Sequence, residues 1–335
     1  ARIDLDLAHS YRPDPKEDGD YALLPLKMSF RDGGAYALLG PSGCGKTTML
    51  NIMSGLLVPS TGTVSFDGVD MTRATPQQRN IAQVFQFPVI YDTMTVAENL
   101  AFPLKNRGVA ADRIKQRVGQ IAEMLEMSGQ LDMRAAGLSA DQKQKISLGR
   151  GLVRSDVSAV LFDEPLTVVD PHMKWQLRAS LREVHRRTAT TMIYVTHDQT
   201  EALTFASKVV VMYDGMIVQV GTPAELFDKP SHTFVGYFIG SPGMNLLDAT
   251  VEGDRATVAG VSLPLGASYG AQKGRVQIGI RPEYAVLTEG AGLPIRIEDR
   301  TGDTTYTQRR RQRADPPHIL LTTPESLALL LSYED

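Results

Sequence analysis

The sequence is poor in cysteine and has no long apolar run. Its single cysteine, Cys44, excludes a disulfide within the chain and a metal site rich in cysteine, as is typical of a reducing compartment. No stretch approaches the ~20 apolar residues that span a bilayer, and the first residues lack the pattern of a secretory signal. We therefore expect a soluble cytoplasmic protein that meets a membrane only through partners.

The sequence also lacks a strong charge of either sign. Its 35 Lys and Arg residues nearly balance 38 Asp and Glu residues, so the net charge of −3 gives no electrostatic reason to expect a nucleic acid partner. The 335 residues are 42% hydrophobic and 22% charged, which indicates a globular protein of about two or three domains. We found no internal repeat or low-complexity tract.

A glycine-rich segment at residues 40–48 fills a complete Gly-x-x-x-x-Gly-Lys-Thr pattern. Its members are Gly40, Pro41, Ser42, Gly43, Cys44, Gly45, Lys46, Thr47 and Thr48. A short apolar strand precedes the segment and an apolar-periodic helix follows it, as the motif requires. Glycines let backbone N–H groups turn inward toward phosphate oxygens, and the helix N-terminus adds positive charge. We therefore predict that Lys46 reaches the β and γ phosphates of a nucleotide and that Thr47 ligates Mg²⁺.

Two further apolar runs end in polar side chains. Residues 159–162 are typical of a central parallel strand and lead to Asp163 and Glu164. Because doubly wound sheets hold ligands at the carboxyl ends of their strands, we expect Asp163 to contact Mg²⁺ and Glu164 to polarise an attacking water. Residues 192–196 predict another buried strand, which ends at His197. A structural role and a site role fit His197 equally well.

Tyr11 and Gln86 each allow two interpretations. Tyr11 follows a predicted N-terminal strand and could stack on a flat ligand such as adenine or pack on the sheet. Gln86 follows the predicted strand at residues 81–85, and its amide could reach a metal or a water or simply end the strand. The residues around them leave both alternatives open.

The rest of the pattern predicts two domains. Helical periodicity over residues 112–127 and 142–152 predicts a helical subdomain at about residues 87–155, inserted into a nucleotide domain of residues 1–240. A Ser-Pro-Gly linker follows at residues 241–243. Short runs at Val258, residues 276–280 and residues 285–287 then predict a β-rich domain over residues 241–298.

Taken together, these motifs resemble the ATPase subunit of an ATP-binding cassette (ABC) transporter. Tyr11, the loop at 40–48, Gln86, the Leu-Ser-Ala-Asp-Gln segment at 138–142, residues 160–164, Asp170 and His197 follow the order and spacing of that family. Residues 278–283 resemble the oligonucleotide-binding (OB) fold-like regulatory domain of sugar-importer ATPases. The resemblance implies an α/β fold: a P-loop NTPase domain with an inserted helical subdomain, followed by a small β-rich OB-fold-like domain.

The resemblance also implies how this chain holds its own ATP. Tyr11 would stack on adenine, and Lys46 and its loop would hold the phosphates. Gln86 would join Thr47 and Asp163 as a magnesium ligand.

Further roles follow from the same resemblance. Glu164 would be the catalytic base, and His197 would contact the γ phosphate. Ser139 and Gln142 would face the ATP of a second ATPase subunit, toward which the loop of Asp170 would cross. Residues 87–102 would form the surface that meets membrane subunits.

The family signature Leu-Ser-Gly-Gly-Gln has Ala140 and Asp141 in place of its two glycines here. Glycines allow close approach to the partner's γ phosphate, whereas the Asp141 carboxylate would repel it unless the side chain points away. Since this signature serves the ATP of the partner, the two sites of a dimer would differ. We therefore expect a heterodimer of two different ATPases rather than a homodimer.

The resemblance implies ATP hydrolysis, with Mg²⁺, coupled to import of a small polyol or sugar. Residues 79–107 and 139–154 look most like the ATPases of bacterial glycerol importers, within the sugar and glycerol-3-phosphate group. Besides the second ATPase, the expected partners are two membrane permease subunits and, indirectly, an extracytoplasmic substrate-binding protein. The permeases would hold the chain at the cytoplasmic face of the bacterial inner membrane. A soluble ABC ATPase without a transport role and an ATP-binding regulatory subunit with weak hydrolysis are the alternatives.

From about residue 299 the chain departs from this family. Residues 299–335 resemble a fragment of a superfamily 2 helicase, but they contain no phosphate loop or Asp-Glu-x-His box. We therefore expect an atypical tail, disordered or wrongly assigned, that adds no helicase activity.

Overall fold

The computed structural model describes residues 1–272, 276–285, 297–300, 305, 307–308, 311 and 319–322. The chain divides into two compact units, Ala1–Met244 and Asn245–Asp335. The predicted linker at residues 241–243 falls at the end of the first unit.

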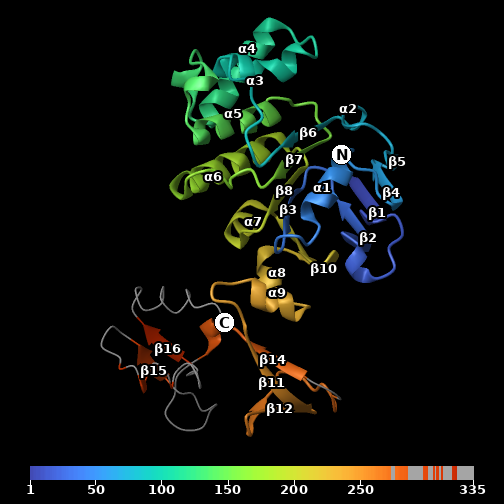
Figure 1. Ribbon diagram of the computed structural model, residues 1–335, viewed down its shortest axis with the longest axis vertical. Coiled ribbons are helices and arrows are strands. Elements are labelled where there is room, and N and C mark those ends of the chain that lie inside the picture. The colour runs from blue at the N-terminus through green and yellow to red at the C-terminus, as the bar shows by residue number, and fades with distance from the viewer. Residues whose placement is uncertain are drawn as a thin grey trace. The chain divides into compact units, whose positions relative to one another are not determined.

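A six-stranded sheet forms the centre of the first unit, in the order β10-β9-β3-β8-β7-β6 (Figure 1). Its strands are β3 (Ala35–Leu39), β6 (Ile81–Val84), β7 (Ala159–Asp163), β8 (Met192–Thr196), β9 (Lys208–Tyr213) and β10 (Met216–Gly221). All neighbours pair in parallel except β9 and β10, which form an antiparallel hairpin. Every residue of β3 and β8 is buried, as expected for parallel strands that are covered on both faces.

A second, antiparallel sheet in the same unit has the order β2-β1-β4-β5. It contains β1 (Ile3–His9), β2 (Leu23–Phe30), β4 (Thr61–Phe66) and β5 (Val69–Asp70). Apolar side chains of this sheet, of the central sheet and of α1 (Lys46–Ser54) form one buried cluster. Because α1 contributes Met49, Leu50, Ile52 and Met53 to this cluster, the helix that follows the phosphate loop is fixed between the two sheets.

Helices cover the rest of the first unit (Figure 1). They are α2 (Pro76–Arg79), α3 (Val96–Lys105), α4 (Ala111–Met124), α5 (Ala140–Leu152), α6 (Pro171–Thr188), α7 (Gln199–Phe205), α8 (Pro223–Asp228) and α9 (Thr233–Phe238). Helices α3, α4 and α5 lie together beyond the β6 edge of the sheet and share one apolar cluster with it. This group corresponds to the predicted helical subdomain.

The predicted bounds of two helices differ from the observed ones. Helix α4 ends at Met124, before the predicted residue 127, and α5 begins at Ala140 because Ser139 caps it. Helix α3 lies within the predicted helical subdomain, but periodicity did not define its bounds, and its interior contains Pro103. A capping box between Thr95 and Glu98 marks the start of α3, and this local signal could have identified it.

The second unit contains a four-stranded antiparallel sheet with the order β13-β12-β11-β14. Its strands are β11 (Asn245–Glu252), β12 (Arg255–Val258), β13 (Val261–Pro264) and β14 (Val276–Ile280). Strands β15 (Ile297–Arg300) and β16 (Ile319–Thr322) pair separately and in parallel. The runs predicted at Val258 and residues 276–280 are strands, whereas Ala285 lies outside a strand and residues 286–287 lie outside the described residues. Among the helices that the structure describes, none is long and apolar enough to cross a membrane.

Candidate active site for nucleotide binding and hydrolysis

The phosphate loop joins the end of β3 to the start of α1. Gly45, the residue before α1, has a φ of 99°, a left-handed conformation that glycine adopts readily. A Cβ atom at Gly40 would lie 2.2 Å from the Met212 carbonyl oxygen, and one at Gly45 would lie 2.4 Å from the Ala22 carbonyl oxygen. The loop therefore requires glycine at both positions, and its amides can approach a phosphate closely.

Lys46 is buried within the curve of this loop. Its ammonium group donates to the carbonyl oxygens of Gly40 and Pro41, over 2.9 and 2.7 Å. Cys44 is also buried, and burial raises the pKa of its thiol, so the thiol stays neutral and fills space. Of the other loop members, Ser42, Gly43 and Thr47 are exposed, Pro41 is half-buried and Thr48 is buried.

Three adjacent strands bring the predicted residues together at the edge of the central sheet that is formed by the carboxyl ends of its parallel strands. Strands β3, β8 and β7 are parallel neighbours, and Gly40, His197 and Glu164 follow them directly. In the register of these strands, Leu39 lies opposite Thr196 and Asp163 lies opposite Val195, so the strands end level with one another. Residues that are far apart in the sequence therefore meet at this edge.

Thr47 and Asp163, two of the predicted magnesium ligands, contact each other. The Thr47 hydroxyl donates to the Asp163 carboxylate over 3.1 Å. Burial raises the pKa of Asp163, and the charge of Glu164 adds to the rise, while the Thr47 hydrogen bond and Lys46 oppose it. A carboxylate that is costly to ionise, beside a hydroxyl oxygen, fits a hard cation such as Mg²⁺, whose charge would offset that cost.

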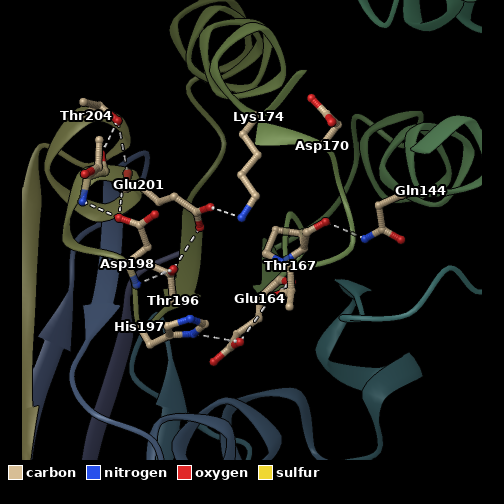
Figure 2. Close-up of polar contacts among 12 residues, drawn as sticks. Gln144, Glu164, Thr167, Asp170, Lys174, Thr196, His197, Asp198, Glu201 and Thr204 are labelled. Carbon is tan, nitrogen blue, oxygen red and sulfur yellow. Dashed lines mark hydrogen bonds and ion pairs between the residues drawn. The ribbon is translucent and has the colours of Figure 1, made fainter. Parts of the chain in front are cut away.

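Glu164 is held in one orientation by its neighbours (Figure 2). Its carboxylate lies 3.1 Å from His197 Nδ1 and accepts a hydrogen bond from the Thr167 hydroxyl over 3.3 Å. Its backbone has a φ of 46°, which is uncommon for a residue with a side chain, and its amide donates to the Val195 carbonyl over 3.0 Å. Strained backbone of this kind clusters at functional sites.

Tyr11 lies beside the phosphate loop, two positions after the end of β1. Its hydroxyl is 3.1 Å from Thr48 Oγ1, and its ring and the His9 ring form a T-shaped pair with 4.7 Å between centroids. The Tyr11 side chain is nevertheless 67% exposed. Because most of this side chain is exposed, it is not packed fully on the sheet. Stacking on a flat ligand therefore remains the prediction for Tyr11.

Gln86 follows β6, the neighbour of β7. Val84 of β6 lies opposite Phe162 of β7 in this parallel pair. Gln86 and Glu164 each follow two residues later, so they leave the two strands at the same level. Gln144 on α5, which the sequence did not single out, supports both segments. Its buried amide donates to the Phe85 carbonyl over 3.2 Å and to the Pro165 carbonyl over 2.6 Å. No local pattern distinguishes Gln144 from the other polar residues of α5.

The altered signature segment forms the N-terminus of α5. The Ser139 hydroxyl accepts from the Gln142 amide over 3.4 Å, and the Gln142 side chain accepts from the Ser139 amide over 2.9 Å. These two predicted ligands of a partner's ATP thus form a capping box. The Asp141 carboxylate accepts a hydrogen bond from the backbone N–H of Asp170 over 3.2 Å. The charge that was expected to repel a phosphate is therefore engaged within its own chain.

The fold agrees with comparisons with known proteins. Residues 23–167 match the ABC transporter family, and residues 240–285 match the MalK OB fold domain. The sn-glycerol-3-phosphate import ATP-binding protein UgpC of Salmonella typhimurium is 43% identical over 280 residues, which cover 82% of this chain and 78% of that protein. This chain belongs to the ABC transporter ATPases. The UgpC protein of Escherichia coli O6:H1 is likewise 43% identical over 277 residues, covering 81% of this chain and 78% of that protein.

Solved structures show the same fold. The structure of cbiO1 from Clostridium perfringens, part of the ABC transporter complex cbiONQ, has a TM-score of 0.60 and 26% identity, and it covers 68% of this chain and 90% of that chain. An ATP-binding cassette dimer in a post-hydrolysis state with ADP and Pi has a TM-score of 0.57 and 24% identity, covering 66% and 98%. This second likeness concerns the fold alone.

Membership of this family confirms the predicted fold class and activity. The ABC transporter ATPase binds ATP and Mg²⁺, couples ATP hydrolysis to transport, pairs with a second ATPase subunit and works with membrane permease subunits. A β-rich MalK-type OB domain follows the ATPase domain. The helicase resemblance from about residue 299 finds no support in these matches, and most of that stretch lies outside the described residues.

Proposed function

We propose that the edge formed by β3, β8 and β7 is one half of a composite ATP site, completed by the signature segment of a second ATPase subunit. The observation that carries this proposal is that Glu164 and His197 follow β7 and β8 directly, beside β3, which leads into the phosphate loop that holds Lys46. One edge thereby combines a cation for phosphate, a carboxylate for water and an imidazole in contact with that carboxylate.

In this proposal Glu164 is the catalytic base. Its carboxylate takes a proton from the attacking water as the water oxygen bonds to the γ phosphorus and the bridging oxygen leaves with ADP. The contacts with His197 and Thr167 limit the rotation of that carboxylate. His197 contacts the γ phosphate, and Lys46 exchanges its loop carbonyls for β and γ phosphate oxygens.

Thr47, Asp163 and Gln86 are the proposed magnesium ligands. Hydroxyl, carboxylate and amide oxygens are the donors that Mg²⁺ prefers, and the first two are already joined by a hydrogen bond. When bound, Mg²⁺ neutralises charge on the phosphate oxygens. Among the described residues, no group of three or more His, Cys, Asp and Glu side chains is arranged to hold a metal ion, but the proposed set needs only one carboxylate.

Tyr11 stacks on the adenine of the same ATP in this proposal. Its ring is largely exposed, while its hydroxyl is tied to Thr48 at the end of the phosphate loop. The remaining loop members, from Gly40 to Gly45, cradle the phosphates through their backbone. Ser139 and Gln142 serve the ATP of the partner through the N-terminus of α5, whose amides point away from the helix.

The second ATPase subunit is, we propose, another copy of this chain. The preference for a heterodimer rested on repulsion between Asp141 and a phosphate, and the comparisons do not support it. The hydrogen bond from the Asp170 amide directs the Asp141 carboxylate to its own chain and weakens that premise. Two identical chains would then form two equivalent sites.

We place the ATPase domain at residues 1–240, with its helical subdomain at about 87–155, and the OB-fold-like domain at 241–298. The chain would lie at the cytoplasmic face of the bacterial inner membrane, held there by permease subunits that contact residues 87–102. Exposed apolar side chains in that segment, Phe87, Val89 and Tyr91, support this surface.

The transported substrate that we propose is glycerol or a closely similar polyol. The name of the UgpC relatives specifies sn-glycerol 3-phosphate, so the three-carbon backbone is common to both. The test uses the full chain with its permease subunits and binding protein in proteoliposomes, with glycerol, sn-glycerol 3-phosphate or a disaccharide outside. We expect glycerol to raise ATP turnover most. Stimulation by the phosphate ester or the sugar alone would overturn the substrate while leaving the ATPase assignment in place.

A further inference from the structure

Glu201 is a buried carboxylate close to the proposed site, with no role in the chemistry described above. It lies on α7, is 3% exposed, and uses both of its oxygens. One oxygen accepts from the Tyr194 hydroxyl over 3.1 Å and from the Thr196 hydroxyl over 2.9 Å. The other lies 3.4 Å from the Lys174 ammonium group. Figure 2 shows Glu201 between Thr196 and Lys174.

Thr196 connects this carboxylate to the backbone around His197. It is the last residue of β8 and directly precedes His197. Its hydroxyl donates to Glu201 and also accepts from the Asp198 amide over 3.0 Å. The Asp198 carboxylate in turn caps α7, accepting from the Thr200 amide over 2.7 Å. The residues on both sides of His197 are therefore fixed by a network that ends on Glu201.

Lys174 connects the same carboxylate to α6. This helix begins next to Asp170, whose side chain caps it by accepting from the His172 amide over 2.9 Å. The ion pair between Lys174 and Glu201 thus joins the helix after the Asp170 loop to the turn that carries His197. The turn contacts Glu164, which lies 3.1 Å from His197, and α6 follows Glu164 in the chain after the loop at residues 165–170.

Packing alone does not explain a charged group at this place. Burying a carboxylate costs free energy, and a well-packed apolar residue of similar volume is often as stabilising as a buried ion pair. The carboxylate does have the geometry to hold three donors from β8 and α6 in fixed positions. Orientation, rather than stability, is the property that it supplies.

We propose that Glu201 is a positioning residue for ATP hydrolysis: through Thr196 it orients His197 opposite Glu164, and through Lys174 it couples that orientation to α6. The proposal rests on the function proposed above for His197 and Glu164. A displacement of about 1 Å in a reacting group can lower a rate by about 100-fold. Loss of this network should therefore affect turnover far more than ATP binding.

The test removes the hydroxyl of Thr196 rather than the buried charge, because Glu201→Ala would leave three donors without an acceptor and endanger folding. In the full chain, Thr196→Val should lower the single-turnover rate of Mg²⁺-ATP hydrolysis by about 10- to 100-fold, with the Kd for ATP unchanged. Thr196→Ser, which restores a hydroxyl, should recover most of the rate. Thr204→Val is the matched control: its hydroxyl donates to the backbone carbonyl oxygens of Thr200 and Glu201 on α7 and not to the Glu201 carboxylate.

A second measurement separates positioning from a general structural role. In a His197→Ala background, Thr196→Val should cause little further loss, because the network acts through the missing imidazole. Glu201→Gln, which keeps the shape but removes the charge opposite Lys174, should lower the rate in the same direction as Thr196→Val, again only when His197 is present.

The outcomes distinguish this inference from the proposed function. The positioning role would be overturned if Thr196→Val lowered the hydrolysis rate equally with and without His197, or if Thr196→Val kept full turnover. In either case, slow hydrolysis by His197→Ala would leave the proposed function in place. Full turnover in His197→Ala would overturn the role of His197, and the positioning inference would fall with it.

Discussion

Polar side chains have opposite arrangements in two regions of the molecule: the carboxyl ends of β3, β8 and β7, and the N-terminus of α5. At the strand edge, side chains from distant parts of the sequence meet: Thr47 with Asp163, and Glu164 with His197. At α5, Ser139 and Gln142 bond to each other within one helical turn. A substitution at the edge should therefore change the chemistry, whereas one at α5 should first change local stability.

Glu164→Gln should give the largest effect. The amide keeps the size of the side chain but cannot take a proton from water, so ATP turnover should fall by at least about 100-fold, while ATP binding persists. Steady-state hydrolysis and equilibrium nucleotide binding measure the two properties. Glu183→Gln on α6, which removes a carboxylate paired with Arg186 and Arg187, is the control and should turn over normally.

The same variant tests the pairing of subunits. With ATP and Mg²⁺, Glu164→Gln alone should form a dimer that is seen by light scattering. A protein that stays monomeric under these conditions, yet pairs when a different ATPase subunit is added, would restore the heterodimer.

Asp141→Ala should have an intermediate effect and tests the difference between the two regions directly. It removes the acceptor for the Asp170 amide and an acid from the first turn of α5, so the free energy of unfolding should fall by about 1.5 kcal/mol. Asp141→Asn keeps an acceptor and should lose less. Chemical denaturation measures both losses.

Turnover of the Asp141 variants decides what the carboxylate does in the dimer. We expect Asp141→Ala to hydrolyse ATP no faster than the parent chain, because the carboxylate is held by the Asp170 amide. Faster hydrolysis in this variant would mean that the carboxylate opposes closure on the partner's ATP.

Ser139→Ala should have the smallest effect on stability. It removes the side-chain cap of α5, and such losses lower the free energy of unfolding by about 1 kcal/mol. Thr222→Ala removes the equivalent cap of α8 and is the matched control. If Ser139 also serves the partner's ATP, Ser139→Ala lowers turnover while Thr222→Ala does not; equal turnover in both would leave Ser139 as a cap alone.

Local patterns were sufficient for the phosphate loop and the short buried strands. Glycine spacing around Lys46 and the apolar runs before Glu164 and His197 predicted β3, β7 and β8 and the polar residues that follow them. Such features depend on neighbours in the sequence, since a strand buried on both faces must be apolar throughout. Helix α3 lies in the segment that was predicted to be helical, but no bounds were predicted for it, because its capping box is a weaker signal than a continuous apolar pattern.

Contacts between distant segments were not accessible in this way. The register of parallel strands, which no local pattern encodes, sets Glu164 against His197. Gln144 looked like an ordinary polar residue of a helix, and only packing of α5 against the sheet gives its amide two carbonyl partners. In the sequence Asp141 has no evident partner, whereas in the structure its carboxylate accepts a hydrogen bond from the Asp170 amide.

Local sequence patterns were enough to predict that this chain binds a nucleotide phosphate and which residue types surround it, because the glycine, lysine and carboxylate requirements are local. How those residues work together depends on the packing of segments that are distant in the sequence. A buried carboxylate such as Glu201 acquires its meaning from donors on β8 and α6, and those donors are brought to it by the packing of helices on a sheet.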